Sequence, residues 1–195
     1  MTTVPGSFVD REISAFTQVE PAAPRNHPFD AEIEAERAGW YELLDLVRSL
    51  DPAEIARPGY YRDPDWSVAD VVAHLGTWLA EAGVQLRRIE VGTYRPRDLD
   101  IDALNAEFRA AMGGQPWEVI LTQAQASRYR MLKVWYALPS RSDSAAWWVA
   151  KAGAEHYREH LARLRAWVSE LHRERDPRQQ RRRAAAIDGQ GRPEP

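Results

Sequence analysis

The sequence contains no cysteine, and this absence removes several kinds of chemistry at once. Without a thiol the chain can form no disulfide, no CxxC redox motif, no thiolate nucleophile and no zinc site with sulfur ligands. Any metal ion that this protein holds must therefore be bound by nitrogen and oxygen atoms.

The chain also lacks a long apolar run and a large excess of charge of either sign. No stretch approaches the roughly 18 apolar residues that a membrane span needs, and the first residues do not show a basic region followed by an apolar one. Lysine and arginine number 26 against 29 aspartate and glutamate residues, so the chain as a whole has no positive field for nucleic acid. These absences favour a cytoplasmic protein without membrane contact and disfavour nucleic acid as its partner.

The chain does have enough apolar residues for one core, because 44% of its 195 residues are hydrophobic and eight are tryptophan. Residues 1–28 contain four prolines and few periodic apolar positions, so we expect a flexible arm there. Residues 29–174 are predicted to form one folded domain. The arginine-rich residues 175–195 are predicted to be a disordered tail, although arginines 181–183 could engage an acidic partner or nucleic acid.

Apolar residues recur at helical spacing in four long segments between these ends, and no segment shows the alternation of a strand. The predicted long helices cover residues 30–50, 67–89, 116–138 and 147–171. A shorter helix is predicted over 101–112, whereas prolines and glycines leave 51–65 without a predicted element. We therefore predict an all-α protein, an antiparallel-type four-helix bundle with a short extra helix in the connection between helices two and three.

The last predicted helix carries two histidines where its inward stripe should carry aliphatic side chains. His156 and His160 are four residues apart, so their imidazoles project side by side from one helical face, a spacing that suits two ligands of one metal ion. His74 lies at the edge of the apolar stripe of the second predicted helix and is the best candidate for a third ligand.

A structural role is the alternative for each histidine, because a single inward histidine is more often a hydrogen-bonded core residue than a ligand. Two on adjacent turns are harder to explain in this way, since each imidazole nitrogen buried without a partner costs about 1–3 kcal/mol. Three neutral imidazoles would leave positions open for water or substrate, as in a reactive site. Their spacing does not distinguish zinc, nickel, iron(II) and manganese.

Three other side chains deserve comparison with this set. Glu155 and Glu159 neighbour the two histidines in the chain but point about 100° away from them, so we expect both at the surface or behind the ligands. Arg128 falls within the apolar stripe of the third predicted helix. It could hold an anionic group of a substrate, and the alternative is an ion-paired structural arginine.

Three local patterns together resemble the DinB superfamily. They are WSVxDVVxHL at 66–75, IDxxN at 101–105 and EHYxEH at 155–160. The resemblance covers roughly residues 30–172, and the nearest branches are the mycothiol-dependent maleylpyruvate isomerase family and the ClbS/DfsB-type proteins. It implies a four-helix bundle in which three histidines hold a metal ion, and they correspond here to His74, His156 and His160.

The resemblance also implies an activity, because many members use a low-molecular-weight thiol such as mycothiol or bacillithiol to isomerise or transfer sulfur to a small electrophilic substrate. Arg128 or Asn105 would then steady negative charge on the substrate, although Asn105 suits a turn or helix cap equally well. Two other functions stay open. The metal could activate water in a hydrolase or self-resistance protein that disarms a reactive small molecule, or the bundle could be a non-catalytic binding or stress-response module. A homodimer through exposed tryptophans also stays open.

Overall fold

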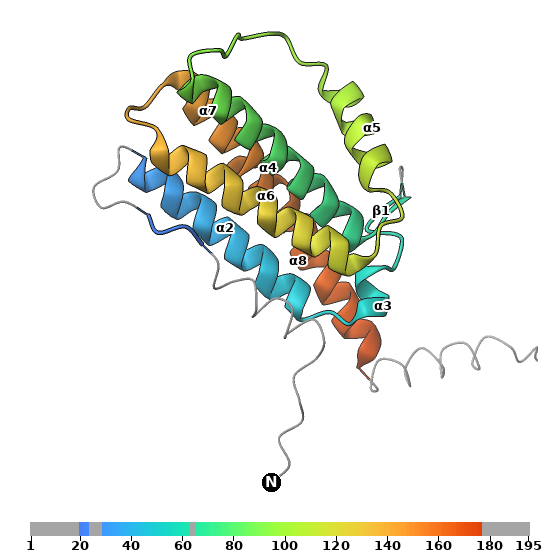
Figure 1. The fold of residues 1–195 in the computed structure, drawn as a ribbon. Coiled ribbons are helices and arrows are strands. Elements are labelled where there is room, and N and C mark those ends of the chain that lie inside the picture. Colours follow the sequence, from blue (N-terminus) through green and yellow to red (C-terminus); the bar gives the residue numbers. More distant parts are fainter. Residues whose placement is uncertain (1–19, 24–28, 63–64, 177–195) are drawn as a thin grey trace, which may run out of the picture.

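The computed structural model describes residues 20–23, 29–62 and 65–176 (Figure 1). The predicted flexible arm lies outside the described residues except for 20–23, and the predicted tail lies outside them from residue 177 onward. Within the described part no helix is both long and apolar enough to cross a membrane.

Four long helices form the bundle, which confirms the all-α prediction (Figure 1). They are α2 (Asp30–Arg48), α4 (Val68–Glu90), α6 (Trp117–Ala137) and α8 (Ala154–Arg175). The predicted extra helix is α5 (Ile101–Met112), in the connection between α4 and α6. The start of α4 is also as predicted, because Ser67 and Asp70 form a capping box in which each side chain accepts a hydrogen bond from the other's backbone N–H.

The helix directions match the predicted antiparallel arrangement only in part. α4 and α8 run antiparallel, because Trp78 packs on His156 and His74 on His160, whereas two other pairs run parallel. Gly76 lies against Ala124 and Gly83 against Met131, so α4 and α6 run parallel. The helices α2 and α8 run parallel too. Gly39 lies against Tyr157, Glu42 pairs with Arg165, and the backbone oxygen of Ser49 lies beside His172, so residue numbers rise together along the two helices. The reason is the long connection through α5, which returns the chain to the end of the bundle where α4 began (Figure 1).

The last predicted helix is divided in two. It begins earlier than expected as α7 (Asp143–Ala152), capped by Ser142, and α8 follows after Gly153. A Cβ atom at Gly153 would lie 2.7 Å from the carbonyl oxygen of Val149 and 3.1 Å from Cγ of Glu36. Glycine therefore allows α2 to approach this junction, a close contact that helical periodicity could not reveal.

The prediction that 51–65 forms no element is wrong. Asp51 and Glu54 form a capping box around the one-turn helix α3 (Pro52–Ile55), with proline at its first position. Two short antiparallel strands follow, β1 (Tyr61–Arg62) and β2 (Asp65–Trp66), with Tyr61 opposite Trp66. These strands lie beside the start of α4 and bring two aromatic side chains next to the histidines described below.

α4 and α6 approach each other closely at Gly76, two residues after His74. A Cβ atom there would lie 2.8 Å from Cα and 2.9 Å from Cβ of Ala124, and would also meet the side-chain oxygen of Gln123. Farther along the same helix, a Cβ atom at Gly83 would lie 3.5 Å from Met131, which is ordinary van der Waals contact.

These two glycines give a matched test of the packing. We expect Gly76→Ala to lower the free energy of unfolding by about 1–3 kcal/mol, because the helices must separate. Gly83→Ala has room for its methyl group, so it should be neutral or stabilise the helix by up to about 1 kcal/mol. Urea unfolding followed by circular dichroism measures both, and equal effects of the two substitutions would contradict the proposed close contact.

Candidate metal centre

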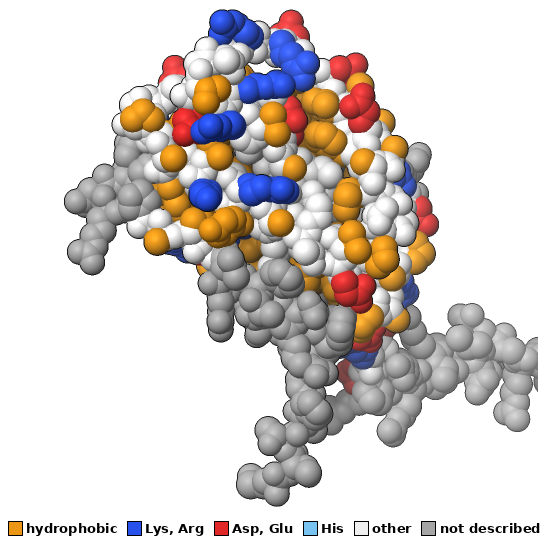
Figure 2. Space-filling model, viewed as in Figure 1, with side chains coloured by type: hydrophobic (Ala, Val, Ile, Leu, Met, Phe, Trp, Pro, Cys, Tyr) orange, Lys and Arg blue, Asp and Glu red, His pale blue; other side chains and the backbone are white. Residues whose placement is uncertain are grey.

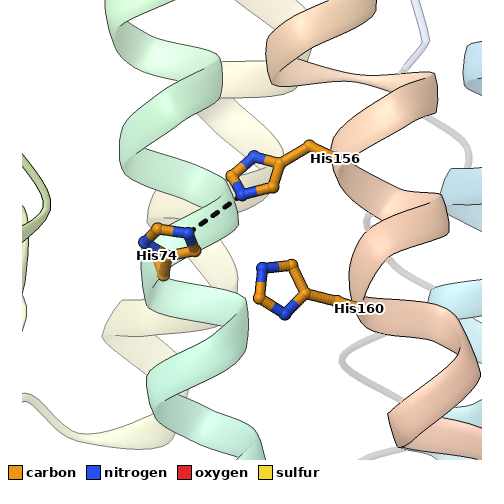
Figure 3. Close-up of side chains that lie close together, drawn as sticks. All are labelled: His74, His156 and His160. Carbon is orange, nitrogen blue, oxygen red and sulfur yellow. Dashed lines mark hydrogen bonds between the residues drawn. The ribbon is translucent and has the colours of Figure 1, made fainter. Parts of the chain in front are cut away.

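Three imidazoles from two helices converge inside the bundle (Figure 3). His74 lies in the second turn of α4, while His156 and His160 lie in the first two turns of α8. Nε2 of His74 is 2.9 Å from Nε2 of His156, and one ring nitrogen from each of the three histidines lies within 4.8 Å of the others. The structure thus brings together all three histidines selected from the sequence.

The spacing of these nitrogens fits a single divalent cation. Two nitrogens bound to one ion at about 2.0–2.1 Å lie about 2.8–3.0 Å apart at an octahedral right angle and about 3.3–3.4 Å apart in tetrahedral geometry. The 2.9 Å separation of the His74 and His156 nitrogens falls within the octahedral range. The centroid of the His160 ring is 5.3 Å from that of His74 and 5.1 Å from that of His156, and a ring nitrogen of His160 lies within 4.8 Å of the other two nitrogens.

Burial keeps these imidazoles neutral. His156 is only 6% exposed, and His74 and His160 are partly buried. Loss of water, followed by the neighbouring His160, lowers the pKa of His74 to about 3, and burial alone lowers that of His160 to about 4. Burial and then the two other histidines lower the pKa of His156 to about 2. At neutral pH the rings therefore carry lone pairs that a metal ion can use.

Tyrosines from the β1 region orient His160. The hydroxyl of Tyr61 lies 3.1 Å from Nδ1 of His160, and the hydroxyl of Tyr60 donates to the backbone oxygen of His160 at 3.0 Å. With the outer nitrogen held in this way, the other ring nitrogen of His160 faces the centre (Figure 3). Burial also raises the pKa of the Tyr61 phenol, so the group stays protonated and can accept the Nδ1–H of a ligating imidazole.

Two tryptophans form walls of the centre. The ring centroid of Trp66 lies 5.2 Å from that of His74, and the ring centroid of Trp78 lies 5.9 Å from that of His156. The indole N–H of Trp78 donates to Oδ1 of Asn105 at 2.9 Å. Asn105 therefore reaches the centre only through Trp78, and this hydrogen bond links α5 to α4. The alternative role as a helix cap is wrong, because Asp100 caps α5.

Arg128 lies in a different cluster. Its guanidinium donates to both carboxylate oxygens of Glu36, at 2.8 and 2.7 Å, and to Glu20 at 2.8 Å. Tyr157 also donates to Glu36, at 2.9 Å, and Arg128 is only 5% exposed. These contacts occupy the guanidinium, so the structure favours the ion-paired structural role over contact with a substrate.

The acidic neighbours of the histidines stay at the surface. Glu155 and Glu159 are both exposed, and Glu159 pairs with Lys151 at 3.7 Å. Sequence reasoning passed over Tyr61 and Trp66, which do contact the histidines. The available signal was the concentration of aromatic residues in the segment YYRDPDW at 60–66, directly before the helix that carries His74.

The fold and the histidines define a class of protein, a four-helix bundle with a three-imidazole cluster between two of its helices. The chain matches the mycothiol maleylpyruvate isomerase N-terminal domain over residues 36–173, and it belongs to this DinB-like family. The fold is similar to the crystal structure of an uncharacterised protein from Escherichia coli UTI89. That likeness has a TM-score of 0.59 and 15% identity, and covers 72% of this chain and 92% of the other. A search of curated proteins gives no match.

The Arg128 cluster can be tested with two glutamates of α2. Removing Glu36, which is fully buried, takes away the partner that holds the Arg128 guanidinium by two hydrogen bonds. We expect Glu36→Ala to lower the free energy of unfolding by about 3–5 kcal/mol. Glu34 forms only a surface pair with Arg37 and its side chain is 70% exposed, so Glu34→Ala should change stability by less than about 0.5 kcal/mol.

Chemical denaturation of both variants beside the parent protein measures this difference. The same samples should be compared for metal content, because neither glutamate contacts a histidine. A stable Glu36→Ala variant would contradict the structural role assigned to the buried pair.

Proposed function

We propose that this protein holds a divalent metal ion with His74, His156 and His160 and uses it, with a low-molecular-weight thiol, to modify a small electrophilic molecule. One observation carries the proposal, namely the convergence of three neutral imidazoles from α4 and α8. Membership of a family described by mycothiol and maleylpyruvate supports the thiol. Mycothiol is therefore the first cosubstrate to test, and S-transfer and isomerisation are the reactions to look for.

The residues of the chain have separate tasks in this function. The three histidines supply neutral nitrogen donors and leave the remaining coordination positions to water or a reactant. A divalent cation held there would favour thiolate over thiol near neutral pH. Tyr61 fixes the ring of His160, and Trp66 and Trp78 limit the access of water on two sides.

The absence of cysteine is consistent with this scheme, because the sulfur nucleophile comes from the cosubstrate. In the chemical step the thiol loses its proton, and the sulfur adds to one carbon of an electron-poor double bond, whose π electrons move to the attached electron-withdrawing group. In an S-transfer the other carbon of that bond then takes up a proton and the new carbon–sulfur bond remains. In an isomerisation the same bond breaks again after rotation about the neighbouring carbon–carbon bond, and the thiol is regenerated.

The metal ligands can be tested by substitution. We expect His156→Ala or His160→Ala to abolish retention of zinc or another divalent ion, because two imidazoles seldom hold such an ion alone, while most of the helicity remains. Elemental analysis of purified protein and circular dichroism measure the two properties. His172→Ala is the matched control, since His172 is an exposed histidine near the end of the same helix. Unchanged metal content in the two ligand variants would contradict the assignment.

The reaction class is tested on the metal-loaded protein. Consumption of an electrophile should require both the metal and added thiol, and it should be lost in His156→Ala. Consumption without thiol would instead identify a hydrolase with a metal-activated water. A protein that takes up no divalent ion would contradict the proposed function altogether.

A further inference from the structure

A narrow cleft beside His74 is lined by an arginine and a tryptophan whose side-chain N–H groups have no acceptor within the described part of the chain. It lies between β2, the first turns of α4 and the last turns of α5, and Trp66, His74, Phe108 and Arg109 are among its lining residues. Its volume is about 10 Å³, close to that of a single water. The cleft therefore reaches one of the three histidines from the side of α5.

The side chain of Arg109 supplies a positive charge beside this cleft. Its guanidinium lies 5.7 Å from the centre of the Trp66 ring, and Trp66 in turn packs edge to face against His74 at 5.2 Å. Arg109 is exposed, and among the described residues its guanidinium has no carboxylate or carbonyl partner within hydrogen-bond or ion-pair distance. The contact with Trp66 thus places the guanidinium beside the cleft and leaves its N–H donors open to solvent and to a ligand.

Trp66 adds a second unused donor. Its Nε1 is buried and lacks a hydrogen-bond partner in the described part of the chain. The acidic residue that lines the same cleft, Asp70, is already engaged, because its carboxylate accepts from the backbone N–H of Ser67 at 2.8 Å and from the Ser67 hydroxyl at 2.6 Å. An exposed guanidinium, a buried indole N–H without an acceptor and an occupied carboxylate match a ligand that brings its own acceptor oxygens.

We propose that Arg109 and Trp66 bind a carboxylate of a reactant beside the metal centre, so that the protein selects anionic small molecules. The planar guanidinium can bind both oxygens of a carboxylate at once, and the indole N–H can donate to one of them. The binding of an anion follows from these donors alone. The interpretation of this anion as a reactant that the protein selects rests on the proposed function.

The helix that carries Arg109, α5, can make room for such a ligand. None of the residues of α5 is fully buried, and its contacts with the bundle include the hydrogen bond from Trp78 to Asn105 and the edge-to-face packing of Phe108 on Trp78 at 5.6 Å. A carboxylate larger than one water requires α5 to shift, and a helix without buried residues can shift at small cost. The carboxylate can belong either to the electrophile or to the thiol.

The test compares two pairs of related probes, in each of which one member carries a carboxylate and the other is neutral. Fumarate and dimethyl fumarate represent the electrophile, and 3-mercaptopropionate and 2-mercaptoethanol represent the thiol. Because the protein has no cysteine, dimethyl fumarate has no thiol of the protein to alkylate. Binding to every variant is followed by NMR titration of the full chain, with and without zinc, using the backbone amide signals of α5. The indole N–H signal of Trp66, assigned by its loss in Trp66→Phe, is followed as well in the proteins that retain it.

We expect at least one carboxylate probe to bind about tenfold more tightly than its neutral counterpart. Arg109→Gln should remove this preference without weakening the neutral probe, Arg109→Lys should retain part of it, and Trp66→Phe should reduce it a few-fold. Arg130→Gln is the matched control, because Arg130 is an exposed arginine with no place in this cleft. It belongs to α6, which lies on the face where several lysine and arginine side chains are visible (Figure 2). The pair that shows the preference identifies the reactant that carries the carboxylate.

Two results would overturn the anion site: no preference for either carboxylate in the parent protein, or a preference that survives Arg109→Gln. Zinc content measured on the same samples separates this result from the proposed function. An Arg109-dependent preference in a protein that takes up no zinc would leave the anion site in place and remove the metal. Bound zinc without any preference for a carboxylate probe would leave the metal centre in place and remove the anion site.

Discussion

Three neutral imidazoles packed side by side between α4 and α8 are the constraint on which the rest of this structure depends. Each buried ring nitrogen without a partner costs about 1–3 kcal/mol, and three apolar side chains would avoid that cost. The 2.9 Å contact between His74 and His156 satisfies one pair of nitrogens, and Nδ1 of His156 remains without a partner among the described residues. Coordination of a cation by three lone pairs, as proposed above, would offset this cost.

The bundle separates this neutral cluster from its buried charges. His156 faces the centre, whereas the next residue, Tyr157, donates to Glu36 in the Arg128 cluster. Glu155 and Glu159 are exposed, so no carboxylate belongs to the group of possible ligands in the described chain. A divalent cation bound by three neutral donors would keep its full positive charge, which favours deprotonation of a thiol or water more strongly than a site with carboxylate ligands.

Sequence periodicity predicted the parts of the molecule that repeat over several turns. It located the four long helices, and the spacing of His156 and His160 on one stripe with His74 on another predicted their convergence. It could not give the parallel direction of α4 and α6, which depends on how far the connection through α5 travels. Nor could it place the division at Gly153, because the apolar stripe continues through it and the cause is the approach of Glu36 from α2.

The walls of the centre come from segments that periodicity cannot detect. Tyr61 and Trp66 belong to strands of two residues, and Arg109 belongs to a helix with no fully buried residue. Such elements bury no stripe of their own, so their positions follow from contacts with α4 and α8 instead of from local pattern. The long helices fix the three histidines, while these short segments decide what approaches them. Differences in selectivity between bundles of this kind should therefore arise in the connections rather than in the ligand helices.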